Sequence, residues 1–190
     1  GSIGAGKSFV GALLRQRGFL VLDADKAVHE LYRDNQDLRK KLAAKFGEQC
    51  LTETGVNRKY LADLIFKSEG ERLELESTVY PFLTEYVRSF LSSSLEGEKI
   101  RFVEAALFTR TPEILAMLDE VWIVNAPEDV RHRRLVARGL ISADAHRRIV
   151  NQRGVCDAKL FPASKVRVLE NSEDCPSLER QLETALWDFR

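Results

Sequence analysis

The sequence begins with a glycine-rich motif, GSIGAGKS, that strongly constrains the fold. It fits the pattern G-x-x-x-x-G-K-[ST], with Gly1, Gly6, Lys7 and Ser8 at the fixed positions and an additional Gly4 inside the loop. A loop that wraps a triphosphate turns its backbone N–H groups inward, which requires conformations that glycine adopts most easily. The lysine then reaches the β- and γ-phosphates, and the serine hydroxyl is an oxygen ligand suited to Mg²⁺. The motif therefore predicts binding of ATP with Mg²⁺.

The segment after the loop, SFVGALLRQRG, predicts a helix that stops at Gly18 and directs its positive N-terminal end toward the anion. A glycine-rich turn without a ligand is the alternative, but the lysine and the hydroxyl follow the last glycine immediately. The motif normally follows a buried strand, so we expect a first strand to precede Gly1 in the full protein. The residues predicted to cradle the phosphates are Gly4, Ala5, Gly6, Lys7, Ser8 and Phe9.

Composition narrows the class of partner. With 29 basic and 29 acidic residues, the 190-residue chain has no net field that would recruit nucleic acid. No apolar run approaches the roughly 20 residues of a membrane span. Cys50, Cys156 and Cys175 are odd in number and widely spaced, which is typical of unpaired thiols in a reducing cytoplasm rather than of a redox or zinc site. We therefore predict a cytoplasmic protein with neither nucleic acid nor a membrane as its partner.

Four short apolar runs predict buried strands, at residues 19–25, 99–105, 119–126 and 164–171. Segments with helical spacing separate them, which favours a parallel sheet covered by helices on both faces. Ligands of such sheets bind beyond the carboxyl ends of the strands. We therefore expect Asp23 and Asp25, and the residues after the stretch FVE, to face the same crevice as the phosphate loop.

Residues 26–95 contain no convincing strand and four segments of helical spacing, with Gly47, Gly70 and Pro81 as boundaries. This stretch is too long for a simple connection. We interpret it as a helical substrate-binding insertion; additional scaffolding is the alternative. The predicted division is a nucleotide-binding core of residues 1–30 and 96–190, and an insertion of residues 31–95.

The two acids of the run DAD are the candidate proton acceptors. An extended backbone would point Asp23 and Asp25 the same way. A kinase that phosphorylates a hydroxyl needs a carboxylate to take the proton while cations stabilise the moving phosphoryl group. We predict that Asp25 is this base, that Asp23 serves orientation or the water shell of magnesium, and that Lys7 completes the catalytic set. Alternatively, one of the acids caps the next helix and leaves the other for catalysis.

Residues 127–153 predict a helix–turn–helix that is unusually rich in arginine, with Ser142 as the cap of its second helix. A planar, permanently charged guanidinium binds phosphate in two places at once, so a lid over ATP (residues about 130–153) is the favoured interpretation. Arg134, Arg138 and Arg148 are predicted to bind the β- and γ-phosphates, Arg138 with a catalytic role. A solvated basic face is the alternative for most of the seven arginines: Arg131, Arg133, Arg134, Arg138, Arg147, Arg148 and Arg153.

The order of these motifs resembles that of the dephospho-coenzyme A kinases. The phosphate loop, VLDAD, NR..L...IF, the LF after the strand at 99–105, R...RG.IS...A..RI..Q and Asn171 after the last strand all occur in that order. The resemblance implies a P-loop NTPase fold, a three-layer α/β/α core with a five-stranded parallel sheet, a helical CoA-binding insertion and a helical lid. It also implies that ATP phosphorylates the ribose 3′-hydroxyl of dephospho-CoA, giving CoA and ADP in the last step of CoA biosynthesis.

The sequence departs from the family pattern at four positions. Phe9 stands where the family has Thr, Tyr80 where it has His, Thr109 where it has Glu, and Ser164 where it has Asp. The motif residues that it keeps are Lys7, Ser8, Asp23, Asp25, Arg138 and Gln152.

The kept residues favour an active enzyme. Tyr32, Arg58 and Tyr80 are candidate contacts of the pantetheine arm. Two other functions stay open: another small-metabolite or nucleoside monophosphate kinase, and a switch that binds ATP without transferring its phosphate.

Overall fold

The computed structural model describes residues 1–93, 100–106, 110–154, 156–172 and 175–188. It divides into two compact units: unit 1 is Gly1–Val21 with Lys99–Arg190, and unit 2 is Leu22–Glu98. Thr109 lies outside the described residues. None of the described helices is both long enough and apolar enough to cross a membrane.

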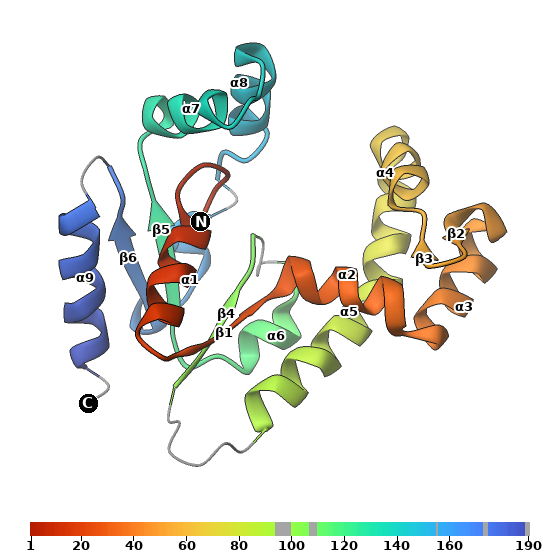
Figure 1. Ribbon diagram of the computed structural model, residues 1–190, viewed down its shortest axis with the longest axis horizontal. Helices are drawn as coiled ribbons and strands as arrows, with labels where there is room; N and C mark the ends of the chain where they lie inside the picture. The colour runs from red at the N-terminus through yellow and green to blue at the C-terminus, as the bar shows by residue number, and fades with distance from the viewer. Residues whose placement is uncertain (94–99, 107–109, 155, 173–174, 189–190) are drawn as a thin grey trace. The chain divides into compact units, whose positions relative to one another are not determined.

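Unit 1 alternates strands and helices, as the sequence predicts (Figure 1). The strands of the core are β1 (Leu20–Asp23, which continues into unit 2), β4 (Arg101–Glu104), β5 (Val121–Asn125) and β6 (Val166–Glu170). Each falls within one of the four predicted runs. The helices are α1 (Lys7–Gln16), α6 (Pro112–Ala116), α7 (Glu128–Ala137), α8 (Ser142–Val150) and α9 (Cys175–Trp187), with short 3-10 helices η3 (Ala158–Leu160) and η4 (Ala163–Lys165).

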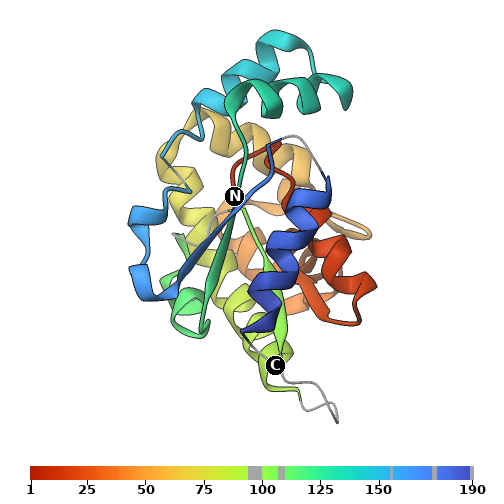
Figure 2. The same ribbon diagram turned by 90° about the vertical axis from the view of Figure 1, so that its left-hand side faces the viewer.

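The strand pairings support an α/β fold. β5 and β6 are parallel, in a register that runs from Val121 opposite Val166 to Asn125 opposite Glu170. β1 neighbours β4. Among the described residues the strands pair only two by two, so the single five-stranded sheet is not confirmed. Figure 2 shows the N-terminus beside β5 and β6, where Gly1 lies against the Val124 carbonyl.

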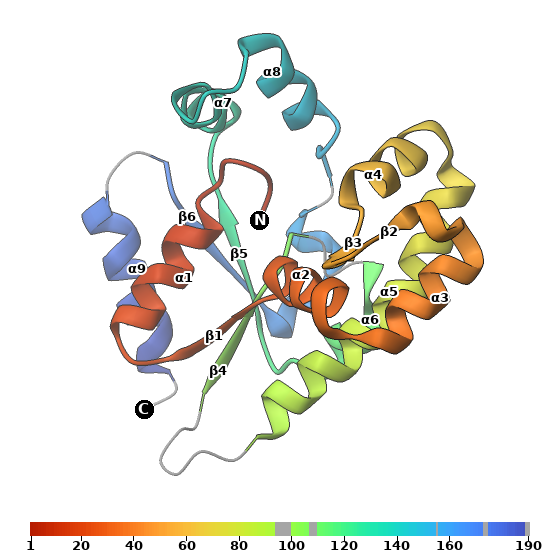
Figure 3. The ribbon, with the colours of Figure 1, turned by 45° about the vertical axis from the view of Figure 1, so that its right-hand side comes forward.

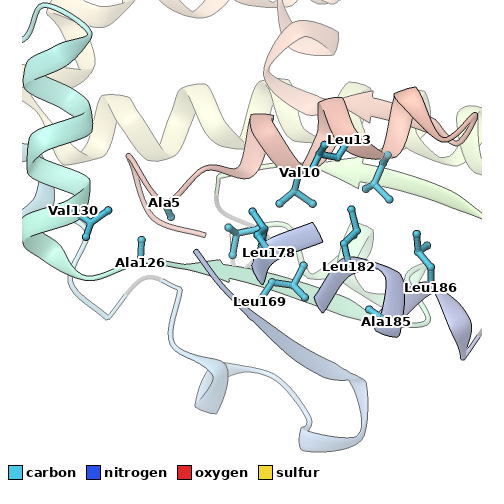
Figure 4. Close-up of a cluster of buried hydrophobic side chains, with 12 residues drawn as sticks. Ala5, Val10, Leu13, Ala126, Val130, Leu169, Leu178, Leu182, Ala185 and Leu186 are labelled. Atoms are coloured by element: carbon cyan, nitrogen blue, oxygen red, sulfur yellow. The ribbon is translucent and has the colours of Figure 1, made fainter. Parts of the chain in front are cut away.

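A hydrophobic cluster fixes the phosphate loop to the rest of unit 1 (Figure 4). Val10 and Leu13 of α1 meet Leu178 and Leu182 of α9, with Leu169 of β6 in the same cluster. Complete burial of one such side chain contributes about 1.5–3 kcal/mol. The cluster also contains loop and α7 residues, so the helix that follows the loop cannot shift without disrupting the core.

Unit 2 is mainly helical (Figure 3). Its elements are α2 (Ala24–Asp34), α3 (Gln36–Phe46), η1 (Glu48–Cys50), β2 (Leu51–Thr52), β3 (Gly55–Val56), α4 (Arg58–Lys67) and α5 (Glu69–Ser92). Each α-helix begins after a side chain that accepts hydrogen bonds from first-turn amides: Asp23, Asn35, Asn57 and Ser68. These caps explain why the helices start where they do.

Two predictions for this stretch are wrong. β2 and β3 form an antiparallel pair, Leu51 with Val56 and Thr52 with Gly55, where no strand was expected, because two-residue strands leave no periodicity to read. Gly70 and Pro81 lie inside α5 instead of ending helices. An internal proline costs about 3 kcal/mol. The reason α5 tolerates it is a buried stripe at four-residue spacing on one face of the helix: Leu75, Val79, Leu83 and Val87.

Candidate active site

The phosphate loop depends on two glycines in the left-handed region. Gly4 has φ +77° and Gly6 has φ +102°. A Cβ on Gly4 would lie 2.9 Å from the Arg131 carbonyl oxygen, and a Cβ on Gly6 would overlap Asn171 Nδ2. Both positions therefore need glycine for conformation and for space. Left-handed residues within such a turn form a concave anion-binding nest of N–H groups.

α1 begins directly after the loop, at Lys7. It has no side-chain cap and no acid in its first turn, so its N-terminal end stays positive toward an anion. The Ala5 N–H donates to the Ser2 carbonyl at 3.1 Å, and the Phe9 N–H donates to the Gly6 carbonyl at 3.0 Å. Two of the predicted phosphate donors thus already have backbone partners in the structure. Lys7 Nζ donates to the Ser2 carbonyl at 3.5 Å.

Glu104 is a site residue that the sequence analysis missed. It ends β4, and its Oε1 accepts a 2.7 Å hydrogen bond from Ser8 Oγ. Its Oε2 is buried without a hydrogen-bond partner among the described residues. A Cβ on Gly11 would lie 2.8 Å from this oxygen, so the glycine in α1 leaves room for the carboxylate. The acid that closes the strand stretch RFVE was the signal available in the sequence.

The expected arrangement of the two acids is wrong. Asp23 is the N-cap of α2, and its Oδ1 accepts from the amides of Asp25 at 3.1 Å and Lys26 at 3.2 Å. Asp25 is therefore helical, and no extended strand points the two carboxylates together. Uncapped amides at a helix start need an acceptor, and Asp23 is in place to supply it. The capping alternative is confirmed for Asp23, while Asp25 lies exposed in the first turn.

Of the three arginines predicted to bind phosphate, the structure joins Arg134 to the loop. Its Nη1 lies 3.5 Å from the Gly4 carbonyl oxygen and 3.4 Å from that of Ala5, and its Nη2 donates to Asn171 Oδ1 at 3.1 Å. Arg138 caps the end of α7 and is exposed, as is Arg148 on α8. No described contact joins either of these two to the loop.

The arginines of the predicted hairpin differ in their surroundings, and Arg131 and Arg153 both lie beside Glu128. Arg131 is buried and lies 3.6 Å from Glu128, which Arg153 also binds through two hydrogen bonds of 2.9 and 2.8 Å. The hydrogen bonds from Arg153 lower the pKa of Glu128. Ser142 is not the cap of α8: Ile141 precedes the helix, and the Ser142 hydroxyl lies 3.1 Å from His132 Nε2.

The hairpin of α7 and α8 contacts the first half of the loop. Ile3 packs against its small core of Leu135, Ala145 and Ile149. The Ile3 N–H donates to Gln152 Oε1 at 2.7 Å. Gln152, which the family pattern singled out, is thus a loop contact.

In unit 2 two of the candidate substrate contacts, Arg58 and Tyr80, each affect the third, Tyr32. Burial raises the pKa of Tyr32 to about 12, an effect that the positive charge of Arg58 opposes and Tyr80 reinforces. Arg58 and Tyr80 therefore each lie close enough to Tyr32 to act on its pKa. Their contact with a substrate stays a prediction.

Two cysteines are unpaired thiols, as the sequence analysis predicted. Cys50 is buried and free, and burial raises the pKa of its thiol. Cys156 is free and half-buried, and its thiol donates to the Ala106 carbonyl at 3.5 Å. The Cys175 side chain lies outside the described atoms. No group of three or more His, Cys, Asp or Glu side chains that could hold a metal occurs among the described residues.

The glycine-rich loop, the positive start of α1 and the Ser8–Glu104 pair lie on an α/β fold, and they define a P-loop nucleotide-binding protein. Comparison with known proteins narrows this class. The chain matches the family model of CoaE, dephospho-CoA kinase, over residues 1–176. It is 32% identical over 189 residues to the dephospho-CoA kinase of Staphylococcus aureus, covering 98% of this chain and 89% of that protein. It is 33% identical over 191 residues to the dephospho-CoA kinase of Staphylococcus haemolyticus, and the match covers 99% of this chain and 92% of that protein.

Solved structures also resemble the structure of this chain. A Thermus thermophilus protein is similar with a TM-score of 0.79 and 31% identity, over 100% of this chain and 95% of that one. The dephospho-CoA kinase of Campylobacter jejuni is similar with a TM-score of 0.69 and 20% identity, over 99% of this chain and 93% of that one. At this identity the likeness supports the fold alone. The chain belongs to the dephospho-CoA kinase family.

The loop geometry predicts that Gly6→Ala abolishes tight ATP binding. The new methyl group would collide with Asn171 and would force an unfavourable φ, so we expect affinity to fall at least about 100-fold, measured by calorimetry. Gly18→Ala is the matched control, because Gly18 has φ +87° with no atom within 4 Å of its Cβ position. It should lose roughly 1 kcal/mol of stability and no ATP affinity. Equal losses in the two variants would contradict the steric argument.

Proposed function

We propose that this protein is a dephospho-CoA kinase that transfers the γ-phosphoryl group of ATP to the ribose 3′-hydroxyl of dephospho-CoA, giving CoA and ADP. The observation that carries the proposal is a complete phosphate loop, with Ser8 bonded to Glu104, in a chain of this family. The loop amides and Lys7 bind the phosphates and hold the leaving group in line. The reaction would be the last step of CoA biosynthesis, and the free thiols of Cys50 and Cys156 support a location in the cytoplasm.

We also propose a division of labour along the chain. Residues 1–30 and 96–190 form the nucleotide core, a three-layer α/β/α structure in which the described strand pairs belong to one parallel sheet of five strands. Residues 31–95 bind dephospho-CoA, with Tyr32, Arg58 and Tyr80 as the candidate contacts. Residues 130–153 act as a lid that brings the exposed Arg138 and Arg148 to the phosphates of bound ATP.

The residues beside the loop fit Mg²⁺. The Ser8 hydroxyl donates its hydrogen to Glu104, so its lone pairs are left for a cation. A serine hydroxyl is a hard oxygen donor of the kind that would hold Mg²⁺ together with bound nucleotide. When bound, Mg²⁺ neutralises charge on the phosphates. We propose Ser8 as its ligand and Glu104 as the residue that orients the Ser8 hydroxyl.

Asp25 is the proposed base. Its carboxylate takes the proton of the 3′-hydroxyl as the oxygen attacks the γ-phosphorus. Asp23 supports it through the backbone, because its cap fixes the amide of Asp25. The charge of Asp23 is not needed for this task, since asparagine caps a helix equally well.

Three incubations test the proposed function against the alternatives. The protein is incubated with ATP and dephospho-CoA, with ATP and AMP, and with ATP alone, and the products are weighed by mass spectrometry. We expect CoA and ADP in the first tube only. ADP from AMP would indicate a nucleoside monophosphate kinase, and ADP without an acceptor would indicate an ATP-hydrolysing switch.

We expect Asp25→Asn to lower kcat by about 10²–10⁴-fold while the KM for ATP stays within about twofold, because the amide cannot take a proton. Steady-state kinetics with both substrates measure this. Asp23→Asn is the matched control, with the same substitution two residues earlier and a preserved cap, and it should stay within about threefold of the parent. Near-normal turnover of Asp25→Asn would exclude it as the base.

A double-mutant cycle tests the Ser8–Glu104 pair. Glu104→Gln should raise the Mg²⁺ concentration needed for half-maximal ATP binding by about 5–10-fold in calorimetric titrations, because a neutral acceptor orients the hydroxyl less firmly. In a Ser8→Ala background the same substitution should change nothing further. Glu170→Gln, at the end of β6, is the matched control. A Glu104 effect of equal size in both backgrounds would show that Glu104 does not act through Ser8.

A further inference from the structure

Asn171 is a buried side chain that the proposed reaction does not yet use. It directly follows β6, is 7% exposed, and donates its backbone N–H to the Asn125 carbonyl at 2.7 Å. This bond extends the β5–β6 pairing by one residue, so the backbone of Asn171 is held by the sheet. Its side chain therefore projects from a fixed point.

The side chain of Asn171 binds the phosphate loop. Nδ2 donates to the Ala5 carbonyl at 2.7 Å in a buried hydrogen bond across 166 positions of sequence. Oδ1 accepts from Arg134 Nη2 at 3.1 Å, and the other terminal nitrogen of Arg134 lies 3.4 Å from the same Ala5 oxygen. The Ala5 carbonyl is thus held by two donors.

The chemistry of its two partners, the Arg134 guanidinium and the Ala5 carbonyl, explains why position 171 is an asparagine. The guanidinium can only donate and the backbone carbonyl can only accept, so the residue between them needs one acceptor and one donor. An aspartate would place an acceptor against the Ala5 oxygen. An aliphatic side chain would leave Arg134 Nη2 without this acceptor and the Ala5 oxygen with only the longer contact from Arg134 Nη1, which is unfavourable in a buried place.

The contacts of Asn171 and Arg134 with the Ala5 oxygen determine the direction of the Ala5–Gly6 peptide. In a planar trans peptide the C=O and N–H bonds point in opposite directions. With the Ala5 oxygen fixed toward Asn171 and Arg134, the Gly6 N–H points away from them, and it has no partner among the described residues. That amide belongs to the left-handed turn of the loop that forms the anion nest.

We propose that Asn171 is a positioning residue for the polyphosphate of ATP. It holds the Ala5–Gly6 peptide so that the Gly6 N–H donates to a phosphate oxygen beyond the α-phosphate. The proposal rests on the proposed function only in that the loop binds ATP.

The experiment compares nucleotides of different phosphate length. Calorimetry of Asn171→Ala should show ATP and ADP affinities reduced by about tenfold or more, with AMP affinity within about twofold of the parent. Asn125→Ala is the matched control: Asn125 ends the paired strand, and its side chain binds Glu170 instead of the loop. Its nucleotide affinities should stay unchanged. An equal loss for AMP and ATP in Asn171→Ala, or no loss, would overturn the proposal.

A second measurement separates positioning from general damage to the fold. Selective ¹⁵N-glycine labelling limits the amide spectrum to the glycines of the chain. Addition of ATP should shift the Gly6 amide proton downfield in the parent and much less in Asn171→Ser, whose small polar side chain disturbs the packing least. An undiminished Gly6 shift in this variant would overturn the proposal.

The outcomes distinguish the two levels of inference. A parent that binds ATP and forms CoA, with Asn171 variants that bind ATP normally, would overturn the role of Asn171 alone. A parent that binds ATP and shows the Asn171 effect without forming CoA would overturn the function alone. A parent that binds no ATP would overturn both.

Discussion

A phosphate loop that turns its amides toward a ligand must turn its carbonyls toward the protein. That constraint shapes unit 1. The carbonyls of Gly4 and Ala5 point to donors on segments more than a hundred residues away: Arg134 at the end of α7 and Asn171 after β6. The loop is short and rich in glycine, so its own sequence cannot hold one conformation. Its shape is therefore a tertiary property, set by the elements that surround it.

The surroundings of the loop are also where the structure leaves polar atoms unsatisfied. Among the described residues, the buried side-chain atoms without a hydrogen-bond partner are Glu104 Oε2 and the Nε and Nη1 of Arg131. Glu104 bonds Ser8, and the backbone of Arg131 packs on Gly4. An unsatisfied buried polar group costs about 1–3 kcal/mol. Proteins retain such unfavourable groups where a site needs a charge in a fixed place. Here Glu104 and Arg131 both lie beside the phosphate loop.

The sequence predicted what depends on local spacing. The loop motif, α1 and the four core strands follow from patterns within a few residues, and each lies where it was expected. Contacts such as Ser8–Glu104 and Ala5–Asn171 could not be predicted, because they depend on which strand ends lie beside the loop. The role of Asp23 stayed open for a related reason: by pattern, an acid at a strand end can face a crevice or cap the next helix, and the structure shows that Asp23 caps α2. At Pro81 the local pattern was misleading: a proline usually ends a helix, but the buried apolar stripe of α5 stabilises a helix that continues through it.

The three arginines predicted to bind phosphate divide into two kinds, and this limits how a lid can work. Arg134 binds loop carbonyls and Asn171, whereas Arg138 and Arg148 are exposed. The same hairpin holds the Ile3 N–H through Gln152 and packs its small core against Ile3. If the whole hairpin rotated as a rigid body, it would break these contacts and release the loop from its phosphate-binding shape. A closing motion that preserves ATP binding therefore has to keep the Arg134 and Gln152 ends docked and move the turn between α7 and α8, near Arg138.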